Sequence, residues 1–477
     1  MPSNRLNVIL FTLLFAVGTL LHAQSPITIF LDPTHPGATI PPDFAGLSFE
    51  TSLLLPDANG VRYFRPDNQP LVTLFHTLGI KSLRVGGNTA DRNAQKLPDH
   101  ADIDSLFSFA KTAGVRVIYC LRLHDGDPQQ DAAVAKYIMD HYSDRVAAFS
   151  IGQEPNVYPK VTNSLGVVTP RPTFPVYAKQ WNEFENAIVA AVPDARFSGP
   201  GVDDNPSWPR QFISDFGKGH HVVLITAHQY PGRSGDKVPS PEIGRDRMLS
   251  ADFINEYQKL YDGFGPIAQT NDLPYRLEEA NNFFNGGATD VSDTFASALW
   301  GLDFMFWWAE HGAAGINFHT GDRVAAGAEL RPSKYTAYFS TDGGFSVRPL
   351  GYGIKAFAVA GHGKIIPATV TNPGDLNVSV YAVLGDDKNI YVTVINKEHG
   401  DSARVAAISF SGGSFSSVAA MPLTIPDNNI AAKSGMTLGG AEINKDGTWT
   451  GKWTDPGPAN TIKIPAGSAS IIKLTQN

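Results

Sequence analysis

Between about residues 44 and 320 the chain repeats a two-part pattern, in which a short apolar run ends in glycine or polar residues and a helical segment follows. This alternation is typical of parallel strands joined by helices. The runs that we expect to be strands are 44–50, 82–86, 116–122, 146–152, 196–202, 222–229, 275–281 and 315–319. Eight such units predict an α/β fold of the (β/α)8 TIM barrel type, which takes about 250 residues. An open doubly wound sheet is the alternative, but no G-x-G-x-x-G turn follows the first strand.

The clearest helical pattern lies between the last two of these strands. Asp290 and Ser292 are candidate caps before it, and Gly312 stands where the helix is expected to stop. Apolar residues recur between them at helical spacing: Phe295, Leu299, Leu302 and Phe306. We therefore expect a helix that buries one face on the sheet.

After about Phe345 the pattern changes to short alternating runs, such as 378–382 and 390–394, separated by Gly, Asn, Asp and Pro. This pattern has little helical periodicity and predicts a C-terminal β-sandwich domain. The apolar run Ile27-Thr28-Ile29-Phe30-Leu31 precedes the barrel and is expected to add a strand to the sandwich. The expected organisation is a signal peptide over 1–23, an N-terminal strand segment over 24–43, a barrel over 44–344 and a sandwich over 345–477.

The amino end carries an export signal by its pattern. Arg5 precedes an apolar, uncharged run from Val8 to Leu21, and His22-Ala23-Gln24-Ser25 fits cleavage after Ala23. We expect a secreted or periplasmic protein. No later segment has the roughly 20 apolar residues that a spanning helix requires, so no membrane association is expected after the signal is removed.

Cysteine usage and charge exclude several kinds of bond and binding partner. The single cysteine, Cys120, lies within the apolar run 117–121, so it is expected to be a buried structural thiol rather than a nucleophile, and no intramolecular disulfide can form. The formal net charge is −8, and Lys and Arg do not cluster. A nucleic-acid partner would normally require a basic stripe, so we exclude one, together with long sulfated polyanions.

Two strand ends carry glutamates that are candidates for catalysis. Glu154 follows the fourth predicted strand, and Glu278 and Glu279 lie near the end of the seventh. Strand ends converge at one face of a barrel, so Glu154 and one of the pair are expected to oppose each other. Opposed carboxylates are what glycoside hydrolysis needs, and a separation of about 5–5.5 Å gives retention of configuration. The alternative is a solvated polar loop after each strand.

Neighbouring side chains of a strand face opposite sides, so only one of Glu278 and Glu279 is expected to enter the pocket. Burial and the neighbouring negative charge are expected to raise the pKa of the proton-donating carboxyl. The histidines His124, His228 and His319 form no spaced set of the kind that binds zinc, so we predict no metal.

These stretches resemble the acid/base and nucleophile segments of glycoside hydrolase family 79, which holds bacterial β-glucuronidases and heparanases among the retaining barrel glycosidases. The resemblance runs in order along the barrel and, with the terminal sandwich, covers nearly the whole mature chain. The segments that carry it are 153–156 and 276–281, with further matches at 46–50, 83–88, 227–230 and 317–319.

The resemblance implies roles for individual residues. Glu154 would be the acid/base, and Glu279 the nucleophile, because the family places that residue two positions before an asparagine, here Asn281. Tyr230 would hydrogen-bond the nucleophile. Glu50, Asn88 and His319 fit positions that bind sugar hydroxyls. The mechanism implies no cofactor.

Structural roles are the alternative for several residues of these motifs. Glu50 can cap the first helix, and His228 can be a hydrogen-bonded core histidine. Arg84 can pair with a nearby acid.

The sequence departs from the family pattern at two places. Gln153 stands where related barrels usually have an asparagine that contacts the sugar 2-hydroxyl. Phe283 and Phe284 correspond to a pair of tyrosines, one of which helps to hold a uronate carboxylate. Losing such a donor should cost on the order of 1.5–3 kcal/mol of binding. Arg323, Lys334 or Tyr335, where the family places further carboxylate contacts, are the candidate replacements.

We therefore predict an exported retaining exo-β-glycosidase that acts by double displacement on a carbohydrate substrate, with a β-glucuronide as the first substrate to test. The alternative enzyme is a β-glucosidase or another hydrolase of neutral β-glycosides, including disaccharide-bearing ones, with Phe284 as an apolar wall beside the sugar C5 substituent. A non-catalytic carbohydrate-binding barrel is the alternative from a different class. The presence of both glutamates favours an enzyme.

Overall fold

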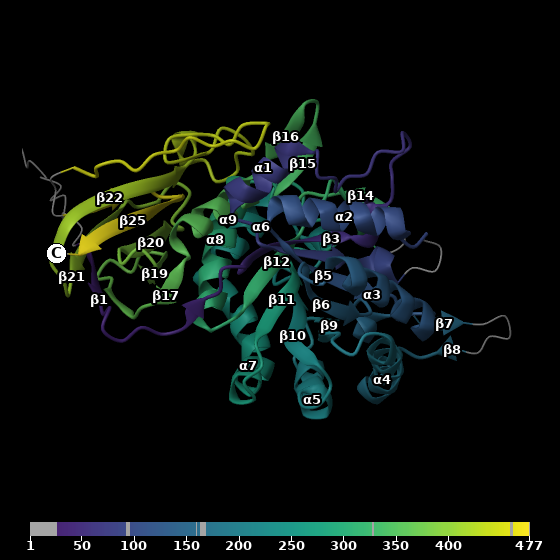
Figure 1. Ribbon diagram of the computed structural model, residues 1–477. Helices are drawn as coiled ribbons and strands as arrows, with labels where there is room; N and C mark the ends of the chain where they lie inside the picture. The colour runs from purple at the N-terminus through teal and green to yellow at the C-terminus, as the bar shows by residue number, and fades with distance from the viewer. Residues whose placement is uncertain are drawn as a thin grey trace, which may run out of the picture.

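The computed structural model describes residues 26–91, 96–158, 160–162, 168–326, 329–457 and 461–476. All eight predicted strands are present, and they form a closed parallel barrel in which the last strand pairs with the first (Figure 1). The predicted fold class is confirmed. The barrel strands are β3 (Ala45–Glu50), β4 (Ser82–Gly86), β5 (Arg116–Leu121), β6 (Val146–Ile151), β9 (Phe197–Asp203), β10 (Val222–Gln229), β11 (Tyr275–Ala280) and β12 (Gly315–His319).

Helices surround the barrel, and local sequence signals fix their ends. The helix α2 is a clear case, since Asp99 and Asp102 form a capping box at its start and Gly114 takes a left-handed conformation (φ 67°) at its end. The helices are α1 (Gln69–Leu78), α2 (His100–Ala113), α3 (Pro128–Tyr142), α4 (Phe174–Ala191), α5 (Ser207–Phe216), α6 (Pro241–Leu249), α7 (Ile254–Thr270), α8 (Phe295–Glu310) and α9 (Pro349–Ala360).

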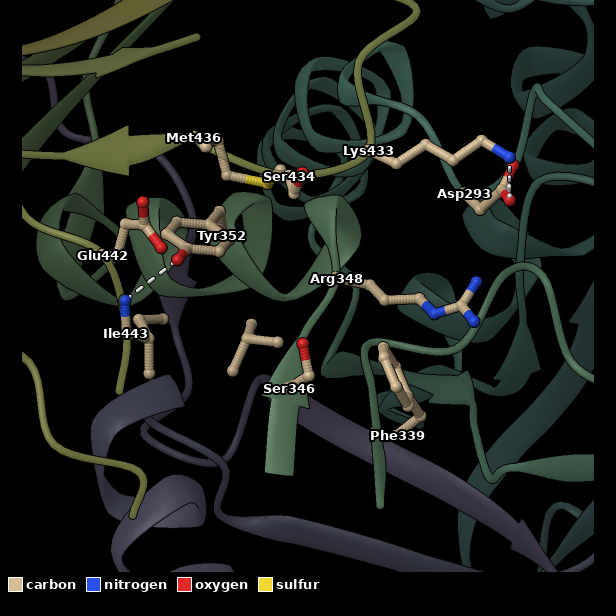
Figure 2. Close-up of a pocket in the computed structure, with 12 residues that line it drawn as sticks. Asp293, Phe339, Ser346, Arg348, Tyr352, Lys433, Ser434, Met436, Glu442 and Ile443 are labelled. Atoms are coloured by element: carbon tan, nitrogen blue, oxygen red, sulfur yellow. Dashed lines mark hydrogen bonds and ion pairs between the residues drawn. The ribbon is translucent and has the colours of Figure 1, made fainter. Parts of the chain in front are cut away.

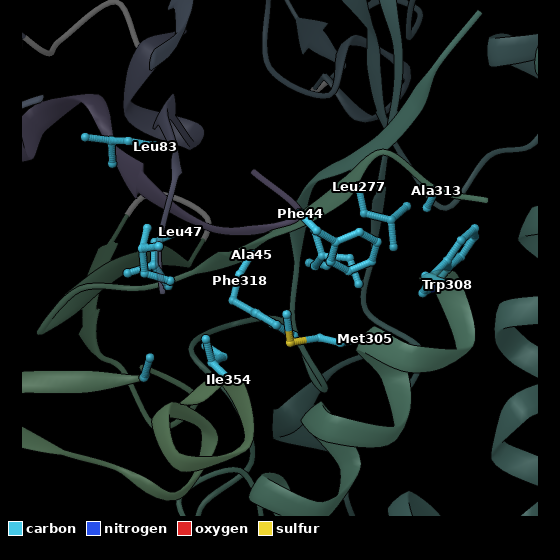
Figure 3. Close-up of a cluster of buried hydrophobic side chains, with 14 of the residues drawn as sticks. Phe44, Ala45, Leu47, Leu83, Leu277, Met305, Trp308, Ala313, Phe318 and Ile354 are labelled. Carbon is cyan, nitrogen blue, oxygen red and sulfur yellow. The ribbon is translucent and has the colours of Figure 1, made fainter. Parts of the chain in front are cut away.

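Side chains of the barrel strands alternate between the two sides of the sheet, apart from register shifts such as the one in β11. Leu47, Leu83 and Phe318 point outward and belong to the same buried cluster as Met305 and Trp308 of α8 (Figure 3). The intervening residues meet inside the barrel, where Arg84 Nη1 donates to Ser48 Oγ at 3.3 Å and Arg276 Nη1 donates to Asn317 Oδ1 at 3.0 Å. The barrel interior is therefore a polar network, and the candidate site continues from it.

The helix α8 differs from its prediction in two respects. It begins at Phe295 after the cap residue Thr294, so Asp290 and Ser292 precede it, although Gly312 does follow its end. Every residue from Phe295 to Ala309 is buried, where one buried face was expected. The reason is that α9 and the sandwich cover its outer side, and the sandwich segment supplies the carbonyls of Ile430 and Ala432 to its first N–H groups.

The sandwich consists of a four-stranded and a seven-stranded sheet. The predicted N-terminal strand, β1 (Ile27–Leu31), lies inside the first sheet and pairs with β18 and β21, as expected. Ile27, Ile29 and Leu31 pack with Val392 and Val394 between the sheets. The first sheet contains β18 (Ala368–Thr371), β1, β21 (Ala406–Ser411) and β24 (Ile462–Ile464), and the second contains β2 (Thr39–Ile40), β17 (Gly363–Ile365), β19 (Val378–Gly385), β20 (Ile390–Asn396), β25 (Ser468–Gln476), β22 (Phe415–Thr424) and β23 (Thr437–Leu438).

A helix stands where the sequence pattern indicated only strands. The helix α9 lies after Phe345 and packs on α8 and α1, so it belongs to the helical layer of the barrel. Its mainly apolar sequence hides the helical period, because it is buried between the barrel and the sandwich. The boundary between barrel and sandwich at 345 stays a prediction.

The barrel and the sandwich are joined by buried polar contacts. Lys397 Nζ of the segment after β20 lies 3.0 Å from Asp303 Oδ2 of α8, and the Tyr381 hydroxyl donates to Asp303 Oδ1 at 2.7 Å. Further along the junction, Lys433 pairs with Asp293 at 2.9 Å beside a cavity of about 320 Å³ (Figure 2). These contacts hold the sandwich in one orientation on the barrel.

Two further expectations concern Cys120 and export. Cys120 is a free, buried residue of β5 with its Sγ 3.3 Å from the Gly152 carbonyl oxygen, and burial raises the pKa of its thiol to about 12, which fits the predicted structural role.

The predicted signal peptide over 1–23 lies outside the described residues. Within the described ranges, no helix has the length and apolar character needed to cross a bilayer.

Replacing Asp303 with Ala is expected to lower the free energy of unfolding by about 3–5 kcal/mol, because Lys397 and Tyr381 would stay buried without their partner. The matched control is Asp140→Ala, which removes an exposed pair with Lys136 and should cost less than about 1 kcal/mol. Chemical denaturation measures both values. Equal effects of the two substitutions would contradict a buried junction.

Candidate active site

The two predicted catalytic glutamates lie together at the carboxyl ends of the barrel strands. Glu154 follows β6, and Glu279 lies near the end of β11. One carboxylate oxygen of each and one ring nitrogen of His228 all lie within 4.8 Å of one another. Two residues 125 positions apart in the chain therefore face each other across one pocket.

Glu279 is almost fully buried and accepts several hydrogen bonds. Arg84 Nη1 donates to it at 2.7 Å, Gln153 Nε2 at 3.1 Å and the Tyr230 hydroxyl at 2.8 Å. Burial on its own raises the pKa of this carboxyl, but His319, His228 and Arg84 outweigh burial and hold the pKa well below its usual range. Glu279 is therefore a carboxylate, as a nucleophile requires.

Glu154 is presented by a strained turn. Its backbone has φ 50° and ψ 54°, a left-handed conformation that costs a non-glycine residue of order 1–3 kcal/mol. Its N–H donates to the Gly201 carbonyl at 3.0 Å, and the helical turn η3 (Pro155–Val157) starts directly after it. The side chain keeps 14% of its surface exposed, against 7% for Glu279. Glu154 is thus the more accessible of the two carboxyls.

Glu278 and Glu279 are both buried but have different surroundings, and that only one of them enters the pocket stays a prediction. The pairing register of β11 shifts between Leu277 and Ala280, so the strict alternation is interrupted there. Leu277 belongs to the apolar cluster, whereas Glu278 Oε2 accepts from Ser198 Oγ at 3.4 Å and Glu278 Oε1 lies 3.6 Å from His228 Nε2. Glu279 faces the pocket and Glu278 lies buried beside it.

Gln153 is buried and holds the centre of the site together. Its side-chain oxygen accepts from Arg84 Nη2 at 2.5 Å, and its amide nitrogen donates to Glu279. Its backbone N–H donates to Asp91 at 2.6 Å. These bonds place its amide between Arg84 and Glu279, and its contact with a sugar 2-hydroxyl stays a prediction.

Glu50 and Asn88 both hold the backbone of Ala325. Glu50 is 3% exposed and accepts from Ala325 N at 3.0 Å, from Thr89 N at 2.9 Å and from Thr89 Oγ1 at 2.8 Å. Asn88 Nδ2 donates to the Ala325 carbonyl at 3.3 Å. The hairpin of β13 (Arg323–Ala326) and β14 (Glu329–Pro332) is therefore fixed at the barrel mouth. Glu50 does not cap the first helix, and its role as a sugar ligand stays a prediction.

His319 connects this hairpin support to the predicted nucleophile. Its Nε2 lies 3.5 Å from Glu50 Oε1, and its Nδ1 lies 3.1 Å from Ser48 Oγ and 3.7 Å from Glu279 Oε2. Burial lowers its pKa, but Glu279 and Glu50 outweigh burial and raise it. A protonated His319 would thus balance two buried carboxylates.

An apolar wall lies beside Glu279. Tyr230, Val324 and Tyr335 form a cluster against which the partly buried Phe284 packs, with its ring edge-on to that of Tyr230 at 6.2 Å. Phe283 is fully buried in the main hydrophobic cluster, whereas Phe284 packs on this wall.

The other candidate residues of this region have backbone partners. Asn281 Nδ2 donates to the carbonyls of His319 and Tyr335, which gives Asn281 a structural role. Arg323 is exposed and donates to the Leu330 carbonyl across its hairpin, and the Lys334 N–H donates to the Gly286 carbonyl.

The residue set Glu154, His228 and Glu279 could also hold a metal ion by its spacing. His228 Nδ1, however, already lies 2.9 Å from Glu154 Oε1, and a metal would have to displace the proton between them. That the mechanism needs no metal stays a prediction.

The sequence pattern did not indicate that His228 links Glu154 to Glu278, because these contacts join residues far apart in the chain.

Replacing Glu50 with Gln is expected to cost roughly 1.5–3 kcal/mol of stability at neutral pH, since an amide cannot accept all three donors. The pKa of Glu50 is lowered, so its stabilisation is present above the usual glutamate range and is lost as the pH falls. The deficit of the variant should therefore shrink in acid. Thermal unfolding at two pH values and hydrogen exchange of the Ala325 amide measure these effects.

The control for this prediction is Arg331→Ala, which removes an exposed pair between the same hairpin and Asp236 and should change stability little. A Glu50→Gln variant with unchanged Ala325 exchange would show that Glu50 does not hold the hairpin.

Comparisons of the sequence with known proteins give partial matches only. No family model matches the chain. A 191-residue segment is 24% identical to a β-glucuronidase of Aspergillus niger and covers 37% of this chain and 35% of that one. A 218-residue segment is 25% identical to a β-glucuronidase of Neurospora crassa and covers 40% and 37%. The match thus spans little more than a third of these relatives.

Among solved structures, a 4-O-α-L-rhamnosyl-β-D-glucuronidase from Fusarium oxysporum 12S has a TM-score of 0.72 at 18% identity, covering 94% of this chain and all of that one. A family 51 arabinofuranosidase from Xanthomonas axonopodis pv. citri has a TM-score of 0.65 at 14% identity with the same coverage. The chain has the barrel-and-sandwich fold that these glycosidases share.

Proposed function

We propose that this protein is a retaining β-glycosidase with Glu279 as nucleophile and Glu154 as acid/base. The observation that carries the proposal is the approach of the two carboxylates to within 4.8 Å. Retaining glycosidases have carboxyl groups about 5–5.5 Å apart, whereas inverting ones need about 6.5–9.5 Å to admit a water molecule. A carbohydrate-binding barrel without catalysis would have no need for two opposed glutamates, one of which has a strained backbone.

The contacts of each glutamate suit its proposed role. The Glu279 carboxylate attacks the anomeric carbon, while Glu154 transfers its proton to the departing glycosidic oxygen. In the second step Glu154 takes a proton from water, which attacks the same carbon and releases Glu279. Arg84 and the Tyr230 hydroxyl hold Glu279 and keep it ionised.

A β-glucuronide is the leading substrate, and membership of glycoside hydrolase family 79 is part of the proposal. Two relatives with partial sequence matches are β-glucuronidases, and the fold neighbour from Fusarium is a rhamnosyl-glucuronidase. The motifs around Glu154 and Glu279 support the same family. We also propose exo action and export through the N-terminal segment, with a secreted or periplasmic enzyme as the result.

A hydrolase of neutral β-glycosides is the second candidate, and the wall of Phe284, Tyr230 and Tyr335 favours it. Phe284 offers no donor to a uronate carboxylate. Arg84, the buried cation nearest Glu279, already binds Glu279 and Gln153. Arg323 is exposed on its hairpin. A neutral hydroxymethyl group would suit the apolar wall better than a charged group.

The Glu154→Ala variant is expected to lose about 10²–10⁴-fold in kcat/KM on glycosides with poor leaving groups, and much less on nitrophenyl glycosides. The reason is that proton donation matters most when the departing oxygen is basic. Steady-state rates on both substrate classes measure the difference, with Glu242→Ala on the exposed face of α6 as the control. Equal losses on both classes would remove Glu154 from the acid role.

A panel of nitrophenyl β-glycosides separates the two substrate candidates. If the enzyme is a β-glucuronidase, we expect the highest kcat/KM on the glucuronide. Efficient turnover of the glucoside with none of the glucuronide would establish the neutral alternative. Turnover of no β-glycoside, including disaccharide-bearing ones, would contradict both.

A further inference from the structure

His228 lies between two glutamates that come from different parts of the chain. Its Nδ1 is 2.9 Å from Oε1 of Glu154, which follows β6, and its Nε2 is 3.6 Å from Oε1 of Glu278 on β11. The side chains of His228 and Glu278 have no exposed surface. The row Glu278, His228 and Glu154 thus leads from the barrel interior to the pocket.

The inner contact of this row joins two atoms that have no other partner. Among the described residues, His228 Nε2 and Glu278 Oε1 are both buried and have no hydrogen-bond partner. Leaving a buried donor or acceptor unpaired costs about 1–3 kcal/mol, and more for a charged group. The two atoms face each other at ion-pair distance, so each satisfies the other when Nε2 carries a proton and Glu278 is ionised.

We propose that Glu278 is a positioning residue for the proton donor: it holds His228 with a proton on both nitrogens, and His228 then selects the oxygen of Glu154 that carries the acid proton. This inference rests on the proposed function, since it assigns a task to residues that support Glu154. Glu278 itself does not touch the reacting atoms.

The selection follows from the direction of one hydrogen bond. When Nδ1 carries a proton it donates to Oε1, so a protonated Glu154 bears its proton on Oε2. The proton on Oε2 passes to the glycosidic oxygen as the bond to the anomeric carbon breaks, and His228 keeps both of its protons throughout. The imidazolium also stabilises the carboxylate that Glu154 becomes. With a neutral His228 whose single proton stays on Nε2 beside Glu278, Nδ1 would accept from Oε1–H instead, and the acid proton would face away from the substrate.

The charges around His228 favour the doubly protonated form. The acidic groups that face it are Glu154 after β6, Asp203 at the end of β9, and Glu278 and Glu279 of β11. Burial lowers the pKa of His228, but the nearby carboxylates of Glu279, Glu154 and Glu278 outweigh burial and raise the pKa to about 9. This pKa lies above the ordinary value for histidine, so His228 is charged across the neutral range and loses its charge as the pH rises through about 9.

The first test needs no activity. In the full-length protein labelled at histidine Cε1 and ring nitrogens, the His228 signals are assigned by their absence in a His228→Gln variant and followed from pH 5 to 10. We expect His228 to remain doubly protonated at pH 7 and to titrate near pH 9. In Glu278→Gln the midpoint should fall by at least one pH unit, and in Glu278→Asp it should stay near that of the native chain. A native midpoint below pH 7, or an unchanged midpoint in Glu278→Gln, would overturn the proposal.

The second test links the row to catalysis. At pH 8, Glu278→Gln should lose on the order of tenfold in kcat/KM on a poor-leaving-group glycoside, lose less at pH 6, and change little on a nitrophenyl glycoside. Glu278→Asp should recover most of the loss. The matched control is Glu185→Gln, which removes the carboxylate from another His–Glu pair, with His220 at 2.8 Å, outside the site.

A uniform loss on both substrates and at both pH values would indicate a merely structural role for Glu278 and would overturn the proposal. If the native chain hydrolyses no glycoside, the proposed function fails, while the histidine titration still decides the state of His228. If Glu278→Gln does not fold, the native titration and Glu278→Asp carry the decision.

Discussion

The buried guanidinium of Arg84 is the interaction on which the candidate site depends. From β4 it joins β3, β11 and the turn after β6 by donating to Ser48 Oγ, to Glu279 Oε2 and to Gln153 Oε1. Without it the barrel would enclose Glu278 and Glu279 with less positive charge than their ionised forms need, and an uncompensated buried charge costs several kcal/mol. The ionised state of Glu279 is therefore a property of the barrel interior as much as of the pocket.

Two glycines make room for this arrangement. A Cβ on Gly86 would lie 2.4 Å from Cζ of Arg84, and one on Gly87, whose φ is 69°, would lie 2.5 Å from Oε2 of Glu50. Any larger residue would displace the guanidinium or the carboxylate that supports the hairpin. The glycine pair in the second strand end is thus explained by close approach, which gives a physical reason for that part of the motif.

The barrel, and the placing of Glu154 and of the Glu278–Glu279 pair at strand ends, could be predicted from the sequence, because an apolar run that ends in a carboxylate is a local pattern. The choice of Glu279 within the pair rested on the family resemblance. The register shift that brings Glu279 to the same side of β11 as Glu278 could not be predicted, since it arises from the pairing of β11 with its neighbours. The link from His228 to Glu278 and the hold of Glu50 on Ala325 had no signal of their own either, because both join residues far apart in the chain. Most residues of α9 are buried, so its mainly apolar sequence shows little helical period, and the sequence pattern indicated no helix there.

Trapping the covalent intermediate tests the role of Glu279 as nucleophile most directly. A 2-deoxy-2-fluoro-β-glycoside with a good leaving group, matched to the preferred sugar, slows the second step of a retaining enzyme and allows the glycosyl-enzyme to accumulate. We expect one sugar per chain, attached to the peptide that contains Glu279, with the label on Glu279 itself. A label on Glu278, or product of inverted configuration without any adduct, would contradict it.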